Sequence, residues 1–427
     1  MFICRRSLIL RYVFMRLTLV FTTTLLLLAG SVATSFSQTP PSVLLVSFDG
    51  FRYDYIDKHD LKNFKAFRAG GVSAEGLIPC YPSLTFANHY SIVTGMLPAS
   101  HGLVDNTFYD SVSNVVYTTA NRKAVSDPQY YGGTPLWMLA KKAGMKSASY
   151  FWVGTEITDR SMAPDITYPY DGKVPFKTRV DSVLAWLNRN DNERPRLITL
   201  YFSEPDHTSH ESGPNSPENH ATLLKMDSVL GYLVAGVKKV NTPVNTIIVS
   251  DHGMAELVHD DKTFVYLDEL YDIKSSKVKT VVSSAIAHLY VNEKPALDSM
   301  YALLKSKEDR FKVYRRNDLP KHLKYNHYRI GDLVLMSEPT FYIRHSGRKN
   351  ANRSRQGLHF GVHGFDPTVV TDMRGIFLAQ GPQIKHGQPL GLVRNIDIYP
   401  LVAKILGLTL PKIDGDPKAL EKIYKER

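Results

Sequence analysis

Acidic residues and histidines recur along the chain in spacings that suit metal binding. Asp206 and His210 stand four residues apart, so on a helix both can face one ion, whereas His207 points elsewhere. Asp251 and His252 are adjacent on a turn before a glycine and form a compact ligand pair. The whole set supplies three carboxylates and three imidazoles: Asp49, Asp206, His210, Asp251, His252 and His363. Such a mixed set fits a pair of Zn²⁺ ions better than Mg²⁺ or Ca²⁺, which prefer oxygen ligands.

Two such ions about 4 Å apart would stabilise the attacking and leaving oxygens of a phosphoryl transfer. His359 competes with His363 for the last ligand position, but glycines at 361 and 364 favour His363 in a crowded site. His101, His288 and His386 receive no role, because histidines of this kind are more often structural or solvated.

The segment from Tyr81 to His89 offers a candidate nucleophile. Pro82 and Ser83 are typical of a helix start, and Ser83 or Thr85 could cap that helix. A hydroxyl at this place lies among free backbone N–H groups, which suits a phosphate and a forming alkoxide. Read alone, the segment favours a simple cap; read with the ligand set, it predicts Thr85 as a nucleophile.

Alternating apolar runs and helical patterns predict an α/β fold. The expected strands are Val43–Phe48, Leu197–Phe202, Thr246–Val249 and Ile376–Ala379, and their continuous apolar character favours a parallel sheet. The expected helices are Leu61–Ala69, Thr134–Ala143, Ser216–Val240 and Asn395–Leu406. This order predicts a sandwich with its site beyond the carboxyl ends of the strands, where the aspartates lie. We expect residues 38–427 to form one catalytic domain, with about 262–361 elaborating one side.

The first 37 residues read as a cleavable signal peptide. They carry Arg5, Arg6, Arg11 and Arg16 without an acidic residue, and an apolar run and small residues follow. An uncleaved membrane anchor is the alternative, although the apolar run is short for a membrane span. Cleavage would leave Cys80 as the one cysteine. An exported chain without disulfides favours a bacterial periplasmic or secreted protein.

The net charge is +11, and four of these charges lie in the predicted signal, so the rest of the chain carries +7. A positive field favours anionic substrates, and solubility explains it equally well. Basic residues gather late in the chain, as between Arg344 and Arg355. No nucleic-acid-binding module, repeat or low-complexity segment is recognised, so a small molecule is the expected partner.

Taken in order, these segments resemble the nucleotide pyrophosphatase/phosphodiesterase family of the alkaline phosphatase superfamily. The matching segments are 47–52, 85–95, 101–106, 206–214, 250–254 and 363–366. The resemblance implies an alkaline-phosphatase-like sandwich, a mostly parallel sheet with helices on both faces. It implies Thr85 as nucleophile and as ligand of one zinc, with Asp49, Asp251 and His252. The second zinc would take Asp206, His210 and His363, and Asn106 would donate to a phosphate oxygen.

Three residues depart from the family pattern. Ser209 stands where the family often has Gly, Ala87 where it often has Pro, and Leu84 where animal members have Lys. Because Ser and Ala are small, we expect adjusted loops with the metal ligands kept.

The expected substrate is a diester or pyrophosphate of a nucleotide. Superfamily monoesterases add Lys and Arg for the extra phosphate charge, whereas the segment Phe151 to Glu156 carries an acid and resembles the Trp-Pro-Gly-Ser-Asp segment of the diesterases. Phe86 and Tyr170, with Trp152 nearby, match positions that stack a nucleobase. Choline-phospholipid diesterase, alkaline-phosphatase-like monoesterase and a metal-dependent receptor for phosphate compounds are the alternatives.

Overall fold

A computed structural model describes residues 41–426 except 276, 292 and 350–353. The predicted signal peptide therefore lies outside the described residues. Pro40–Arg427 groups by its contacts into one compact unit, and every element below belongs to it. The number of catalytic domains stays a prediction. Within the described residues, no helix is both long and apolar enough to cross a membrane.

An eight-stranded sheet in the order β18-β2-β17-β8-β1-β7-β5-β6 forms the centre of this unit. Strand β1 pairs in parallel with both β7 and β8, and β5 pairs in parallel with β6 and β7. Only β17, among these strands, runs antiparallel to both of its neighbours. The strands are β1 (Ser42–Phe48), β2 (Val72–Ile78), β5 (Ser147–Tyr150), β6 (Ile166–Thr167), β7 (Leu197–Phe202), β8 (Val244–Val249), β17 (Phe377–Gln380) and β18 (Leu390–Arg394).

The four expected strands all form, and the parallel prediction is wrong for one of them. The run Ile376–Ala379 becomes β17, which is antiparallel. A continuous apolar run reports burial on both faces of a sheet, and that burial does not depend on strand direction.

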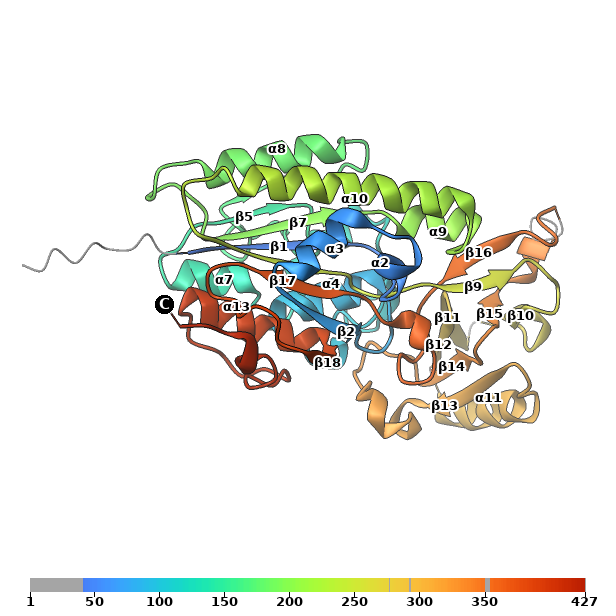
Figure 1. Ribbon diagram of the computed structural model, residues 1–427. Coiled ribbons are helices and arrows are strands. Elements are labelled where there is room, and N and C mark those ends of the chain that lie inside the picture. Colours follow the sequence, from blue (N-terminus) through green and yellow to red (C-terminus); the bar gives the residue numbers. More distant parts are fainter. Residues whose placement is uncertain (1–40, 276, 292, 350–353, 427) are drawn as a thin grey trace, which may run out of the picture. The chain divides into compact units, whose positions relative to one another are not determined.

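Side chains of β1 alternate between two apolar layers. Val43 and Leu45 pack into the layer of helices α4, α7 and α13, while Leu44, Val46 and Phe48 pack into the layer of α3, α8 and α10. Figure 1 shows these two groups of helices on opposite sides of the sheet. The predicted sandwich is therefore confirmed. The helices are α2 (Tyr55–Lys58), α3 (Lys62–Ala69), α4 (Thr85–Thr94), α5 (Pro98–His101), α6 (Arg122–Val125), α7 (Leu136–Lys142), α8 (Phe176–Leu187), α9 (Asp206–Ser212), α10 (Pro217–Val237), α11 (Lys294–Ser306) and α13 (Ile398–Leu406).

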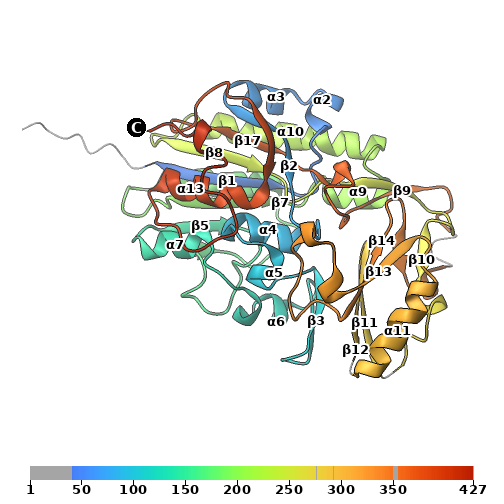
Figure 2. The ribbon, with the colours of Figure 1, turned by 90° about the horizontal axis from the view of Figure 1, so that it is seen from below.

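A four-stranded antiparallel sheet in the order β11-β12-β14-β13 occupies part of the region from 262 to 361. Helix α11 packs on it around a separate apolar cluster that includes Leu289, Leu304 and Leu335. In Figures 1 and 2 this sheet lies near the end of the central sheet that carries α9, β9 and β16. The remaining strands pair as β3 with β4, β9 with β16, and β10 with β15. The bounds are β3 (Thr107–Asp110), β4 (Val115–Thr118), β9 (Ala255–Val258), β10 (Phe264–Tyr266), β11 (Val278–Ser283), β12 (Ile286–Val291), β13 (Phe311–Arg315), β14 (Leu333–Ser337), β15 (Tyr342–Arg344) and β16 (His359–Val362).

Candidate active site

Three aspartates follow three neighbouring strands of the central sheet. The order β8-β1-β7 places Asp251, Asp49 and Asp206 side by side beyond the strand ends. The strands also end level, because Ser47 of β1 pairs with Val249, the last residue of β8, and with Tyr201, the last residue but one of β7. Parallel pairing thus brings together carboxylates that are about 50 to 200 positions apart in the sequence.

Gly50 permits the close approach of two of these carboxylates. Its φ is +65°, and a Cβ at this position would lie 2.9 Å from Cα of Asp206. The Gly50 N–H donates to Asp251 Oδ1 at 3.2 Å, and the Asp206 N–H donates to the Asp49 carbonyl at 3.0 Å. A side chain at position 50 would therefore be strained and would also push α9 away from the site.

Two of the carboxylates are buried, and each of the three has an oxygen without a hydrogen-bond partner among the described residues. Asp49 and Asp251 are 2% and 1% exposed. Among the described residues, Asp49 Oδ1, Asp206 Oδ1 and Asp251 Oδ2 are buried without a hydrogen-bond partner. Burial raises the pKa of Asp49 well above its usual range, and the nearby charges of Asp251 and Asp206 raise it further. Such a cluster requires a positive charge to remain ionised.

Backbone carbonyl groups fix the tautomer of all three predicted ligand histidines. The Nδ1 atoms of His210, His252 and His363 lie 2.8, 2.8 and 2.9 Å from the carbonyl oxygens of Gly361, Gly253 and Ser83, respectively. A carbonyl oxygen only accepts, so each Nδ1 carries the proton and donates it. In the neutral rings Nε2 is then a bare lone pair, the state that binds a metal ion.

The Nε2 atoms and carboxylate oxygens form two adjoining groups. In the first, Asp206 Oδ1 lies 3.4 Å from His210 Nε2 and 3.7 Å from His363 Nε2. In the second, His252 Nε2 lies 3.5 Å from Asp49 Oδ1 and 3.1 Å from Asp251 Oδ2. Asp206 is shared, because its ligand atom also lies within 4.8 Å of those of Asp49 and His252. All six predicted ligands are therefore brought together.

This donor set fits bound cations. The unpartnered carboxylate oxygens and the three Nε2 lone pairs converge, and His363 Nε2 lies only 3.0 Å from His210 Nε2. Two lone pairs at that distance repel each other unless a cation lies against them. Burial lowers the pKa of His363 well below its usual range, and the charges of His252 and His210 lower it further. A proton on His363 is therefore disfavoured as the cation between the two lone pairs.

Two residues of this cluster were not singled out from the sequence. The Tyr201 hydroxyl donates to Asp49 Oδ2 at 2.6 Å. His89 Nδ1 lies 3.3 Å from Asp251 Oδ2, but it donates to the Thr85 carbonyl at 2.9 Å, and its Nε2 meets the Ser47 hydroxyl at 2.8 Å. Both ring nitrogens of His89 are thus engaged, and we infer a supporting position rather than a ligand. The sequence signal for His89 is its spacing of four residues from Thr85 on one helix.

Thr85 is the first residue of α4, and Leu84 takes the cap position. The expectation that Ser83 or Thr85 caps this helix is therefore wrong. The Ser83 hydroxyl instead donates to the Phe365 carbonyl at 2.8 Å and accepts from the Gly364 N–H at 3.1 Å. The helix starts at Thr85, two to three residues after the expected start at Pro82 and Ser83. The Thr85 hydroxyl lies 3.2 Å from His252 Nε2, beside the ligand cluster.

A cavity of about 260 Å³ opens beside Thr85, and the four predicted substrate-binding residues line it: Phe86, Trp152, Glu156 and Tyr170. Tyr170 is 42% exposed, whereas Trp152 is buried and its indole N–H donates to the His89 carbonyl at 3.0 Å. Glu156 forms an ion pair with Arg122 on the same wall. Asn106 lies close by, since its side-chain oxygen accepts the Phe86 N–H at 2.8 Å.

The other histidines contact partners that do not belong to the ligand cluster. His359 is at the opposite end of β16 from His363, is exposed and pairs with Glu256. His101 is buried, its Nε2 lies 3.0 Å from the Ser91 hydroxyl, and burial lowers its pKa to about 3. His386 contacts the Ala69 carbonyl at the surface.

The three residues that depart from the family pattern fit into the helices and packing around the site. Ser209 is fully buried on α9, and its hydroxyl donates to Asn219 at 3.0 Å. Ala87 lies inside α4, and Leu84 is 1% exposed. Asp206 and His210 still face each other across Ser209, as described above.

A mostly parallel α/β sandwich with a candidate metal cluster and a helix-borne threonine at its carboxyl edge defines the class of this protein. A profile of the type I phosphodiesterase/nucleotide pyrophosphatase family matches residues 43–366. The chain belongs to this family.

Known relatives agree with this assignment. Human ectonucleotide pyrophosphatase/phosphodiesterase family member 1 is 35% identical over 405 residues, which cover 91% of this chain and 42% of the human protein. A venom phosphodiesterase of Macrovipera lebetinus is 33% identical over 93% of this chain and 46% of its own length. The chain thus spans less than half of these curated relatives.

The structure is similar to that of human ectonucleotide pyrophosphatase/phosphodiesterase 5, with a TM-score of 0.82 and 29% identity, over 90% of this chain and all of the other. An inactive threonine-to-alanine variant of the murine protein, in complex with AMP, gives a TM-score of 0.81 with 28% identity over the same shares.

The hydrogen bond from Tyr201 to Asp49 yields a prediction. Tyr201→Phe removes the donor that orients a carboxylate of the cluster, so we expect the affinity for an added divalent metal ion, tested with zinc, to fall about 10- to 100-fold. Competition with a chromogenic chelator measures this, with Tyr170→Phe on the cavity wall as the matched control. Equal zinc affinity in Tyr201→Phe and the wild type would contradict a role for this hydrogen bond.

Proposed function

We propose that this protein is an exported zinc-dependent nucleotide pyrophosphatase/phosphodiesterase that releases nucleoside 5′-monophosphates through a phospho-threonine intermediate on Thr85. One observation carries the proposal: the ligand cluster, the Thr85 hydroxyl and an aromatic-lined cavity adjoin one another at a single edge of the sheet.

Two zinc ions are the proposed cofactors. Asp49, Asp251, His252 and Thr85 would hold one, and Asp206, His210 and His363 the other. When bound, zinc ions lower the pKa of a coordinated hydroxyl and neutralise charge on the phosphate and on the leaving oxygen.

The Thr85 hydroxyl is the proposed nucleophile. It attacks phosphorus and displaces the leaving group, and water then hydrolyses the phosphoester and restores the hydroxyl. The N-terminus of α4 favours the phosphate because its backbone N–H groups and dipole attract an anion. The Asn106 side-chain oxygen is occupied by the Phe86 N–H, so its NH₂ group is the part left to donate to a phosphate oxygen.

The charge balance of the cavity favours a diester over a monoester. Arg122 is the cation among the described residues that line the cavity, and its charge is compensated by Glu156. A monoester dianion would need additional positive charge, whereas a diester carries one negative charge.

The aromatic wall suits a nucleobase. Phe86 and Tyr170 provide rings for stacking, and Trp152 is held in place through its hydrogen bond to His89. The paired Arg122 and Glu156 offer a donor and an acceptor to the edge of a base. The names of the relatives and the AMP complex of the murine protein support the same substrate class. Relatives named as ectonucleotide and venom enzymes support export, and we retain a bacterial periplasmic or secreted location as a proposal.

Replacement of the nucleophile gives the first test. Thr85→Ala should lower kcat at least about 10³-fold, because it removes the hydroxyl on which the covalent intermediate is proposed to form. Metal analysis of the variant should still find two zinc ions, which separates chemistry from folding. Activity that survives the change would show that the nucleophile is wrongly assigned.

A substrate panel extends this test to the substrate class. We expect the p-nitrophenyl ester of thymidine monophosphate to be cleaved faster than p-nitrophenyl phosphate and p-nitrophenylphosphorylcholine. A dominant monoester rate would support the monoesterase alternative, and a dominant phosphorylcholine rate the lipid alternative.

Base stacking gives a second prediction. Phe86→Ala and Tyr170→Ala should each raise KM for the thymidine substrate about 5- to 150-fold, since stacking contributes about 1–3 kcal/mol per base. Bis(p-nitrophenyl) phosphate, which has no nucleobase, serves as the control substrate. An equal increase in KM for both substrates would contradict stacking at these residues.

A further inference from the structure

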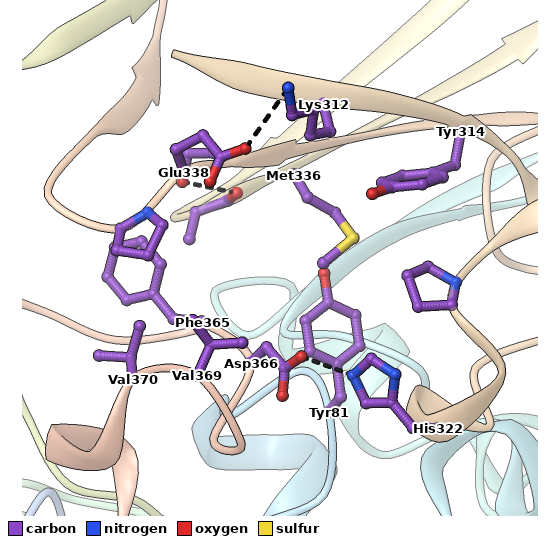
Figure 3. Close-up of a pocket in the computed structure, with 15 residues that line it drawn as sticks. Tyr81, Lys312, Tyr314, His322, Met336, Glu338, Phe365, Asp366, Val369 and Val370 are labelled. Atoms are coloured by element: carbon purple, nitrogen blue, oxygen red, sulfur yellow. Dashed lines mark hydrogen bonds and ion pairs between the residues drawn. The ribbon is translucent and has the colours of Figure 1, made fainter.

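A second cavity is lined in part by the loop that follows His363. Its volume is about 220 Å³, and its walls come from β13, β14, the loop from Gly364 to Val370 and Tyr81. Figure 3 shows this cavity with the Tyr81 ring at its centre. No residue is shared between its described lining and that of the cavity beside Thr85.

The Tyr81 hydroxyl is an unused hydrogen-bonding group in this cavity. Tyr81 is 4% exposed, and within the described part of the chain its hydroxyl has no hydrogen-bond partner. In Figure 3 the hydroxyl points toward Met336, away from the backbone of Tyr81. Burial raises the pKa of Tyr81 well above its usual range, so the group stays protonated and can donate. Buried hydroxyls in proteins nearly always have a partner.

The rest of the wall is mostly apolar, and its charges are paired. Tyr314, Met336 and Phe365 supply rings and a thioether around the Tyr81 hydroxyl. At the rim Lys312 lies 3.8 Å from Glu338, and His322 Nε2 lies 2.7 Å from Asp366. Because each charge at the rim has a partner, the cavity does not favour a charged occupant.

We propose that this cavity binds a small, neutral aromatic molecule with one hydrogen-bond acceptor, which receives the Tyr81 hydroxyl. The size is sufficient, since an apolar cavity of about 150 Å³ accepts benzene. The ring would pack against Tyr314, Met336 and Phe365, whose faces and sulfur favour aromatic contacts. The site is separate from the proposed catalytic cavity, so binding does not require the proposed function.

Acetophenone is a suitable probe, because it combines a ring of the right size with one carbonyl acceptor. We expect isothermal titration calorimetry on the full chain to show one binding event in the millimolar range, unchanged by saturating AMP. Tyr81→Phe should weaken binding about tenfold by removing the donor, and Met336→Trp should abolish it by filling the cavity. Leu392→Ala, a change at an exposed residue of β18, is the matched control and should bind as the wild type does.

Each other outcome overturns the proposal. Absence of binding to the folded wild type would mean that the hydroxyl is satisfied by water alone. Displacement of acetophenone by AMP would place it in the cavity beside Thr85. Equal affinity of the wild type and Tyr81→Phe, with both folded by circular dichroism, would exclude the hydroxyl as the specific contact.

An independent observation concerns a buried network behind Asn106. Asp105 is fully buried, and its Oδ1 accepts the Thr107 N–H at 2.9 Å, which closes a turn around Asn106. The Ser283 hydroxyl at the end of β11 also donates to Oδ1. On β12, His288 Nε2 lies 3.2 Å from Oδ2, while its Nδ1 accepts the Gly331 N–H at 3.4 Å. Nε2 therefore carries the proton and donates to the carboxylate.

We infer that Asp105 and His288 are positioning residues that hold Asn106 against the phosphate site. This inference rests on the proposed function of Asn106. The antiparallel sheet would then contribute to the reaction without touching the substrate, because its two donors fix the carboxylate that fixes the turn.

A double-mutant cycle tests this role with the thymidine substrate. His288→Leu should lower kcat about tenfold with KM little changed, and His288→Gln, which keeps an N–H donor, should restore most of it. In an Asn106→Ala background, His288→Leu should have less than about a twofold further effect. Additive losses in the folded variants would overturn the positioning role. An Asn106→Ala enzyme with unchanged kcat would instead refute the proposed function of Asn106.

Discussion

Three carboxylates on adjacent strand ends, two of them buried, are the constraint on which the rest of the site depends. Asp251, Asp49 and Asp206 follow β8, β1 and β7, and each has an oxygen without a hydrogen-bond partner among the described residues. Like charges in a low dielectric repel strongly, and burial adds to the cost of keeping them ionised. The arrangement is therefore stable only with positive charge in its centre, which is why a metal cluster is the consistent explanation.

The three histidines of the cluster are held in defined orientations by hydrogen bonds to the backbone. The rings of His210, His252 and His363 each donate the Nδ1 proton to a backbone carbonyl, and each carbonyl belongs to a different segment of the chain. The bond from His363 to Ser83 ties the loop after β16 to the segment that enters α4. Ser83 in turn bonds Gly364 and Phe365 through its hydroxyl. The nucleophile candidate and one histidine ligand are thus held by the same few bonds.

Neighbouring residues of that loop have different surroundings. His363 belongs to the ligand cluster, whereas Phe365 lines, together with Tyr81, a mostly apolar cavity. The antiparallel sheet contributes Met336 to this cavity and His288 to the network around Asp105. The region from about 262 to 361, which was predicted to elaborate one side of the domain, therefore contributes residues both to this cavity and to the network around Asp105.

The sequence by itself predicted four strands and four helices of the sandwich, the family and six candidate ligand residues. Local patterns suffice for these, because apolar runs mark buried strands and the ligand types lie directly after them. Strand direction, the start of α4 and the roles of Tyr201 and Ser83 were decided by the tertiary structure. The apolar run of β17 is equally compatible with either direction, and a side chain acquires its hydrogen-bond partner only when distant segments meet. Tyr201 lies 152 positions from Asp49 in the sequence, yet pairing of β1 with β7 places its hydroxyl 2.6 Å from that carboxylate.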